Sequence, residues 1–136
     1  MQSWLQLRGE WSPRVLSVFR IVVALLFLEH GTAKLFGFPH VASFDGLRLF
    51  SLLGAAGVIE VVGSLLVGLG LFTRPAAFIL SGEMAVAYFM AHAPQGFFPL
   101  LNHGEAAAFY CFAFLYLAVA GGGAWSLDRL RHPGDP

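Results

Sequence analysis

Three ionisable side chains lie inside long apolar stretches of the sequence, where a charge is costly. They are Arg20, Glu60 and Glu83, and a charge at the bilayer centre costs about 2.5–3.5 kcal/mol on insertion scales. Counted at about 1.5 Å per helical residue, all three fall at a similar depth, in the half of the membrane nearer the chain ends. One arginine can bridge two carboxylates, and with one cation for two anions a carboxylate can hold a proton. The sequence predicts an inner polar cluster of these three side chains, which either handles protons or only fixes how the helices pack.

A second polar layer is predicted toward the opposite membrane surface. Its members are His30, Lys34, His92, Asn102 and Glu105. These side chains suit proton transfer, metal binding or hydrogen bonding to a quinone-like head group, and polar residues near a membrane surface are also ordinary. The sequence has no H-E-x-x-H motif, no E-x-x-H pair and no cysteine ligand beside these residues, so no metal site is predicted. No catalytic residue is identified.

The composition is that of an integral membrane protein. The chain has 136 residues, of which 57% are hydrophobic and only 12% are charged, and the formal net charge is zero. A soluble domain carries about 25% charged residues, and the absence of a basic patch argues against a nucleic-acid partner. The single cysteine, Cys111, excludes an internal disulfide and a CxxC redox motif.

Four segments are long and apolar enough to cross a bilayer, which takes about 20 helical residues. They span about 15–36, 49–72, 75–91 and 106–125 of a single domain over 1–136. Because backbone groups in lipid must bond within their own segment, we expect an all-α, four-helix membrane bundle. Arginines gather beside the chain ends and between the second and third spans, which predicts that both termini are cytoplasmic. These arginines are Arg8, Arg14, Arg74, Arg129 and Arg131.

Several short motifs, in this order and spacing, resemble the DoxX family of small bacterial membrane proteins. They are HGTAKLFG at 30–37, Glu60 with Gly63, GLFTRP at 70–75, His92, NHGE at 102–105 and GGGAWSLD at 121–128. The resemblance covers nearly the whole chain and implies a multi-pass, four-helix protein of the bacterial inner membrane.

The same resemblance implies a role in redox chemistry. Relatives in this family are linked to thiosulfate:quinone oxidoreduction, and others to a membrane complex with a sulfurtransferase and a superoxide dismutase. We therefore expect a subunit of a quinone-linked membrane redox complex, with no covalently bound cofactor and with a soluble sulfurtransferase or oxidoreductase as partner. The alternatives are a non-enzymatic membrane scaffold and a proton-coupled transporter of small solutes. Stripes of small residues on the predicted helices could also support a homodimer.

Overall fold

A computed structural model describes residues 3–134, and every regular element in that range is helical. The elements in chain order are α1 (Trp4–Phe36), η1 (Ala42–Phe44), α2 (Leu52–Leu69), α3 (Thr73–Ala87), η2 (Tyr88–His92), η3 (Ala93–Gln95), α4 (Pro99–Asn102), α5 (Glu105–Ala120) and α6 (Leu127–Arg131). The third long helix ends irregularly, because α3 continues into the π-helical turn η2 and the 3-10 turn η3.

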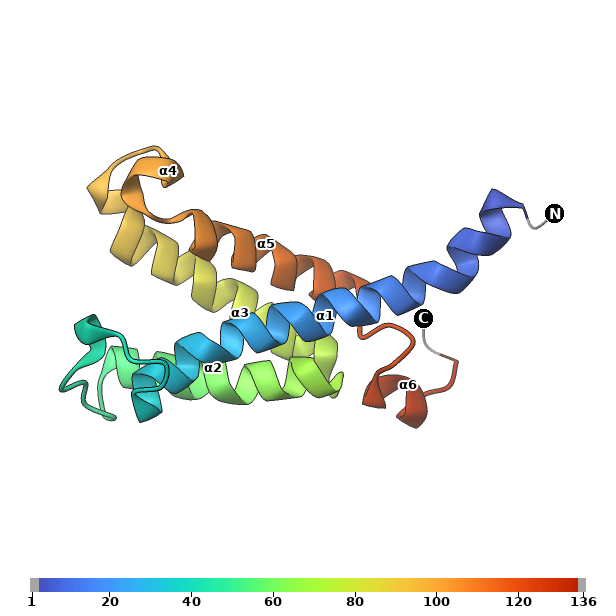
Figure 1. The fold of residues 1–136 in the computed structure, drawn as a ribbon, viewed down its shortest axis with the longest axis horizontal. Coiled ribbons are helices and arrows are strands. Elements are labelled where there is room, and N and C mark those ends of the chain that lie inside the picture. Colours follow the sequence, from blue (N-terminus) through green and yellow to red (C-terminus); the bar gives the residue numbers. More distant parts are fainter. Residues whose placement is uncertain (1–2, 135–136) are drawn as a thin grey trace.

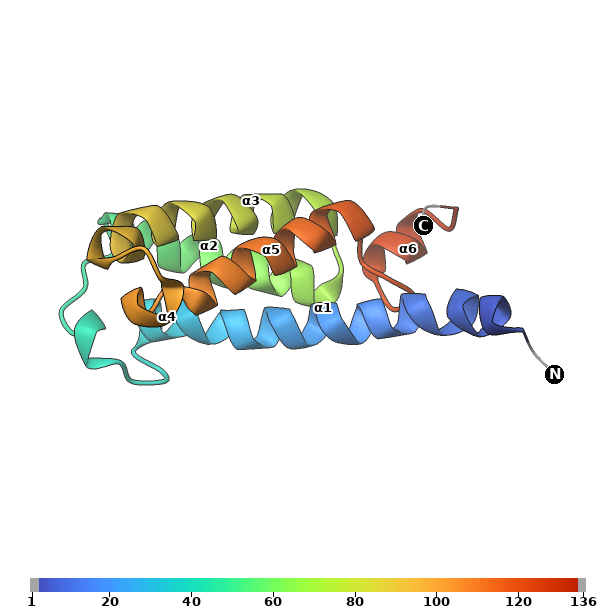
Figure 2. The same cartoon turned by 90° about the horizontal axis from the view of Figure 1, so that it is seen from above.

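The long helices are arranged in two pairs (Figure 1). Helix α1 packs along α2, α3 packs along α5, and contacts between α2 and α3 join the pairs. The pairs lie closest near α6 and farther apart toward α4 and η1, and the view from above shows α1 extending beyond the other helices (Figure 2). We call the two ends of the molecule the α6 end and the α4 end. The beginning of α1 lies toward the α6 end, so the chain enters and leaves the structure on one side.

Three helical stretches are long and apolar enough to cross a membrane. They are α1, α2 and the continuous stretch Thr73–Gln95, whereas the apolar helix α5 has 16 residues and is shorter. Large apolar side chains cover the outside of the helices, as expected of a surface that contacts lipid rather than water. Examples are Leu25, Val62, Phe78, Phe109 and Val119.

The observed helix bounds differ from the predicted spans at several ends. Helix α1 begins 11 residues before the predicted start at 15, because Ser3 and Gln6 form a capping box and Pro13 is accommodated inside the helix. Helix α5 ends at Ala120 rather than at 125, because the chain leaves the helical conformation at Gly121, with φ of 85°.

Small residues set the close approach of the helices. A Cβ atom at Gly31 of α1 would lie 2.7 Å from Val61 Cγ2 of α2, and one at Gly63 of α2 would lie 2.6 Å from Leu80 Cδ2 of α3. Neither position has room for a larger residue, so the helices pack with their backbones close together. The fully buried apolar side chains around these contacts are Phe27, Val67, Leu80, Phe114 and Leu117.

Candidate functional site

A buried ion pair joins the last turn of α1 to the middle of α2. Lys34 Nζ lies 2.5 Å from Glu60 Oε1, and the two side chains are 11% and 1% exposed. Gly57, one turn before Glu60, makes room for the lysine: a Cβ atom there would lie 3.1 Å from Lys34 Cβ. The ammonium group also lies 5.4 Å from the ring centre of Phe44 in η1, where a cation is attracted to the aromatic face.

A second carboxylate, Glu83 of α3, lies beside this pair, because Leu80, one turn before Glu83, packs against Gly63, one turn after Glu60. Both oxygens of Glu83 are buried, and neither has a hydrogen-bond partner among residues 3–134. The same is true of Glu60 Oε2 and of the hydroxyl of Ser64, one turn further along α2. Buried polar atoms are nearly always hydrogen-bonded, so four unpartnered oxygen atoms on three side chains mark an unusual place. We call Lys34, Glu60, Ser64 and Glu83 the carboxylate centre.

The carboxylate centre lies near mid-membrane. At about 1.5 Å per residue, Glu60 is about 14 Å from the end of α2 at Leu69, and Glu83 is about 15 Å from the start of α3 at Thr73. Because the two helices run in opposite directions from a tight connection, the two carboxylates meet at one level. Among residues 3–134, Lys34 is the cation that pairs with one of them, Glu60.

The structure places Arg20 elsewhere, which corrects the predicted bridge from this arginine to Glu60 and Glu83. The guanidinium is fully buried and bonds main-chain carbonyls at the α6 end instead. Nε donates to Gly122 O at 2.7 Å, Nη1 to Val67 O at 2.6 Å and also to Gly68 O, and Nη2 to Trp125 O at 2.7 Å.

The physical reason is a difference in depth. Val67 is seven residues beyond Glu60, so Arg20 lies about 10 Å along the axis of α2 from the carboxylate centre. The last carbonyls of a helix have no partner within it and carry partial negative charge. They attract the guanidinium as a carboxylate would.

The structure also separates the members of the predicted outer site from one another. Lys34 belongs to the carboxylate centre. His92 Nδ1 donates to Asn102 O at 3.0 Å, while the buried Asn102 amide donates to Gly96 O at 2.8 Å and accepts from Gly104 N at 2.8 Å. His92 and Asn102 therefore close the η3–α4 loop.

The other two members of the predicted outer site lie beside α5. The ring of His30 is 5.7 Å from that of Phe27 and 5.6 Å from that of Tyr110, measured between centres. Glu105, in the first turn of α5, is exposed. Glu105, Tyr110 and Tyr116 line a groove of about 940 Å³ between α1 and α5, whose other walls are apolar.

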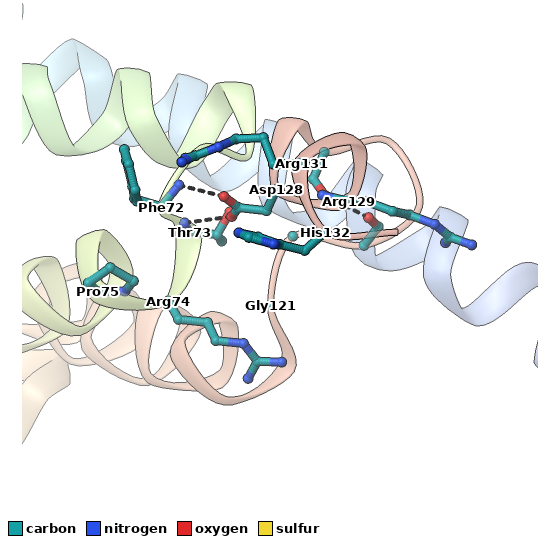
Figure 3. A pocket seen from close by; sticks show the side chains of 12 residues that line it. Phe72, Thr73, Arg74, Pro75, Gly121, Asp128, Arg129, Arg131 and His132 are labelled. Atoms are coloured by element: carbon teal, nitrogen blue, oxygen red, sulfur yellow. Dashed lines mark hydrogen bonds between the residues drawn. The ribbon is translucent and has the colours of Figure 1, made fainter. Parts of the chain in front are cut away.

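Ser64 and Asp128 were not among the predicted site residues. The sequence nevertheless places Ser64 four residues after Glu60, on the same face of α2, and Asp128 in the last of the DoxX-like motifs. Asp128 accepts backbone N–H bonds from Phe72 and Thr73, both 2.8 Å long, and so caps the start of α3 (Figure 3). No local pattern could have paired Asp128 with a helix that begins 55 residues earlier.

Comparison with known proteins identifies the family. The DoxX family model matches residues 15–93, more than half of the chain. The chain belongs to the DoxX family. The matched DoxX region contains Lys34, Glu60 and Glu83 and ends before Asn102 and Glu105.

Curated relatives match along most of their length. An uncharacterized protein of Haemophilus influenzae is 51% identical over 88% of this chain and 92% of its own length. The inner membrane protein YphA of Escherichia coli is 34% identical over 89% of this chain and 93% of its own. An uncharacterized membrane protein of Mycobacterium tuberculosis is 28% identical over 93% of this chain and 87% of its own. No solved structure matches this DoxX chain.

Family and helices together locate the protein. DoxX proteins are membrane proteins, one relative is named an inner membrane protein, and this chain has three helices able to cross a bilayer. It is a multi-pass protein of the bacterial inner membrane.

Proposed function

We propose that this DoxX protein is a proton-exchanging subunit of a quinone-linked membrane redox complex. The observation that carries the proposal is the carboxylate centre, in which Lys34 pairs with Glu60 and a second buried carboxylate, Glu83, has no hydrogen-bond partner among residues 3–134. In this proposal α5 is a fourth span, the four long helices form a membrane bundle, and both termini are cytoplasmic. The protein partner is a soluble sulfurtransferase or oxidoreductase, and a homodimer is compatible with the small-residue helix faces.

The charge balance of the centre supports proton binding. With both carboxylates ionised, the centre would hold one uncompensated negative charge in a medium of low dielectric constant, which is costly. A proton on either carboxyl group makes the centre neutral. It also supplies an O–H donor for one of the unpartnered oxygens. The centre is thus suited to holding one proton.

A quinone head group fits the groove between α1 and α5. The groove is open at the surface, its walls are mostly apolar, and Glu105, Tyr110 and Tyr116 supply the hydrogen-bonding groups. His30 lies between the groove and the centre, since its ring contacts Tyr110 and it stands one turn before Lys34 on α1. In this proposal the protein binds the head group and handles the proton, while the electron acceptor belongs to a partner.

Infrared spectroscopy of the purified protein in lipid tests whether the carboxylate centre holds a proton. At neutral pH we expect the C=O stretching band of a protonated carboxylic acid, shifted in D2O. Either Glu60→Gln or Glu83→Gln should abolish the band, because the remaining carboxylate then pairs fully with Lys34. The matched control Glu10→Gln, at an exposed carboxylate, should keep it. A wild-type protein without the band would disprove the proton claim.

Binding of a short-chain ubiquinone to the purified protein tests the redox assignment. We expect retention above that of empty detergent micelles, and about tenfold weaker binding by Glu105→Gln, which loses a charged hydrogen-bonding group. Glu10→Gln is again the control. Binding no better than that of micelles, or equal binding by the Glu105 variant and wild type, would remove the quinone from the proposal.

A second function, proton-coupled transport of a small solute, is favoured by the bare carboxylate of Glu83. A mid-membrane acid without a protein partner is what a transporter requires for coupling to the proton gradient. Solute flux into liposomes that depends on the pH gradient and is lost in Glu83→Gln would favour this function. The result expected of a scaffold is different. The Glu60→Gln and Glu83→Gln variants would capture the soluble partner as well as wild type does, and the protein would show neither flux nor quinone binding.

A further inference from the structure

The short helix α4 and the residues before it carry large apolar side chains that the rest of residues 3–134 leaves uncovered. Phe97, Phe98, Leu100 and Leu101 are between 61% and 85% exposed, and we call these four residues the α4 cluster. No residue in the range 93–102 is charged. Adjacent apolar side chains of this size are unfavourable in water, and such a patch marks a surface that meets another molecule or a membrane.

The other connection at this end of the molecule carries charges. Between α1 and α2, His40 and Asp45 form an ion pair 3.0 Å long, with side chains 69% and 66% exposed, and Arg48 follows them. This connection also exposes Phe38 and Phe50, but charged groups separate these two aromatic rings along the chain. The α4 cluster, at the same end of the molecule (Figure 1), has no such interruption.

Helix lengths place the α4 cluster at a membrane surface. The stretch Thr73–Gln95 has 23 residues and rises about 34 Å, whereas the 16 residues of α5 rise about 24 Å. The two meet at the α6 end, where Arg74 donates to the carbonyl of Val119. The hydrocarbon core is about 30 Å thick. The loop that joins the other ends of these helices therefore lies between the outermost hydrocarbon and the headgroups.

The loop is held against η2 with polar side chains on its inner side. The buried Asn102 amide donates to Gly96 O and accepts from Gly104 N, and His92 bonds the carbonyl of Asn102. A Cβ atom at Gly104 would lie 2.6 Å from Tyr88 Cε2, so the chain packs directly on this helix. Irregular backbone near lipid needs partners within the protein, and Asn102 supplies two of them. The apolar side chains are left to face outward.

We infer that the α4 cluster inserts into the lipid leaflet at the α4 end, where phospholipid acyl chains cover it. The inference rests on the fourth crossing that the proposed function assigns to α5. The cluster continues a lipid-facing surface, since Phe89 of η2 and Phe109 of α5 are also mostly exposed. Pro99 of α4 and Glu105 line the proposed quinone groove. Insertion of α4 therefore fixes the depth of the groove relative to the headgroups.

Spin labelling of the purified protein in phospholipid nanodiscs tests the insertion. With Cys111→Ser as background, a nitroxide is attached at Leu100→Cys. Two reference labels are attached at Ser43→Cys, an exposed position of η1, and at Phe112→Cys, on the outside of α5. Collisions with oxygen, which is enriched in hydrocarbon, are compared with collisions with a water-soluble nickel chelate. We expect the labels at 100 and 112 to favour oxygen and the label at 43 to favour the chelate.

The two reference labels separate this inference from the proposed fourth crossing. If the label at 100 meets the chelate as freely as the label at 43, while the label at 112 favours oxygen, α4 is not inserted and the crossing stands. A label at 112 that meets the chelate freely would remove the crossing and the insertion together. A label at 100 shielded from both reagents would mean that protein, such as a second copy of the chain, covers the cluster, which would also overturn the inference.

A charge placed beside the label gives a second test at an exposed position that the packing of the bundle does not use. Leu101→Lys should raise chelate collisions at position 100 severalfold, because an ammonium group is costly in hydrocarbon and draws the loop toward water. The matched variant Leu101→Phe, which remains apolar, should leave them unchanged. Equal collision rates in the two variants would contradict insertion, because a loop already in water would not respond to the charge.

Discussion

Arg20 shows how a buried charge in a membrane protein can be satisfied without a counter-ion. Its guanidinium donates to four carbonyls, two at the end of α2 and two in the turn after α5. Glycine at position 70 keeps the space free, because a Cβ atom there would lie 3.0 Å from Arg20 Cζ. The arginine therefore joins three segments of the chain, and its role is to hold the α6 end together.

Replacing this arginine should destabilise the protein strongly. In Arg20→Gln the shorter amide cannot reach all four carbonyls, and each buried carbonyl left unpaired costs about 1–3 kcal/mol. We expect a loss of about 3 kcal/mol or more, measured by unfolding in detergent. Arg8→Gln, at an exposed arginine of the same helix, should leave stability nearly unchanged. If both variants unfold alike, the carbonyl contacts contribute little to the fold.

At the scale of elements, α6 is tied to α3 by Asp128. Burial alone would raise the pKa of Asp128, but the hydrogen bonds from the backbone and side chain of Thr73, the backbone N–H bond from Phe72 and the charge of Arg131 outweigh it and hold the pKa below its ordinary value. A carboxylate at a helix N-terminus is also favoured by the helix dipole. The cap therefore fixes a short terminal helix that has few other contacts.

The cap should make the stability of the α6 end depend on pH. Because the pKa of Asp128 is lower in the folded protein, its contribution is complete above the ordinary pKa of an aspartate and is lost as pH falls through the depressed folded value. Asp128→Asn should lower the free energy of unfolding by about 1 kcal/mol at neutral pH. It should lower it little at a pH below the folded pKa of Asp128. Hydrogen exchange of the Phe72 and Thr73 amides as a function of pH measures this, and parallel profiles for variant and wild type would refute the cap.

At the scale of the whole molecule, the basic side chains are unequally distributed between its ends. Arg74, Arg129 and Arg131 gather at the α6 end, and the first turns of α1 add Arg8 and Arg14. An excess of arginine and lysine marks the cytoplasmic side of inner-membrane proteins. This distribution supports the proposed orientation, in which α4 and η1 face the periplasm.

Cysteine labelling of intact spheroplasts checks this orientation. With Cys111→Ser as background, a membrane-impermeant maleimide should label Phe50→Cys, at a 99% exposed side chain of the α4 end, before the membrane is opened. Leu130→Cys in α6, 77% exposed, should react only after permeabilisation. The reverse pattern would invert the molecule, and labelling of both positions in intact spheroplasts would mean that α5 does not complete a fourth crossing.

The helical class, the membrane location and the charged residues that are costly to bury in lipid could all be predicted from the sequence alone. Apolar runs of bilayer length require helices, and Glu60 and Glu83 stand out because a charge in lipid must be paired or neutral. Tertiary structure decided which cation they meet. Lys34 reaches Glu60 because α1 ends close to it. Arg20 binds at the α6 end because the last carbonyls of α2 have no partner within the helix. Spacing along one helix carries no information about such contacts between distant segments.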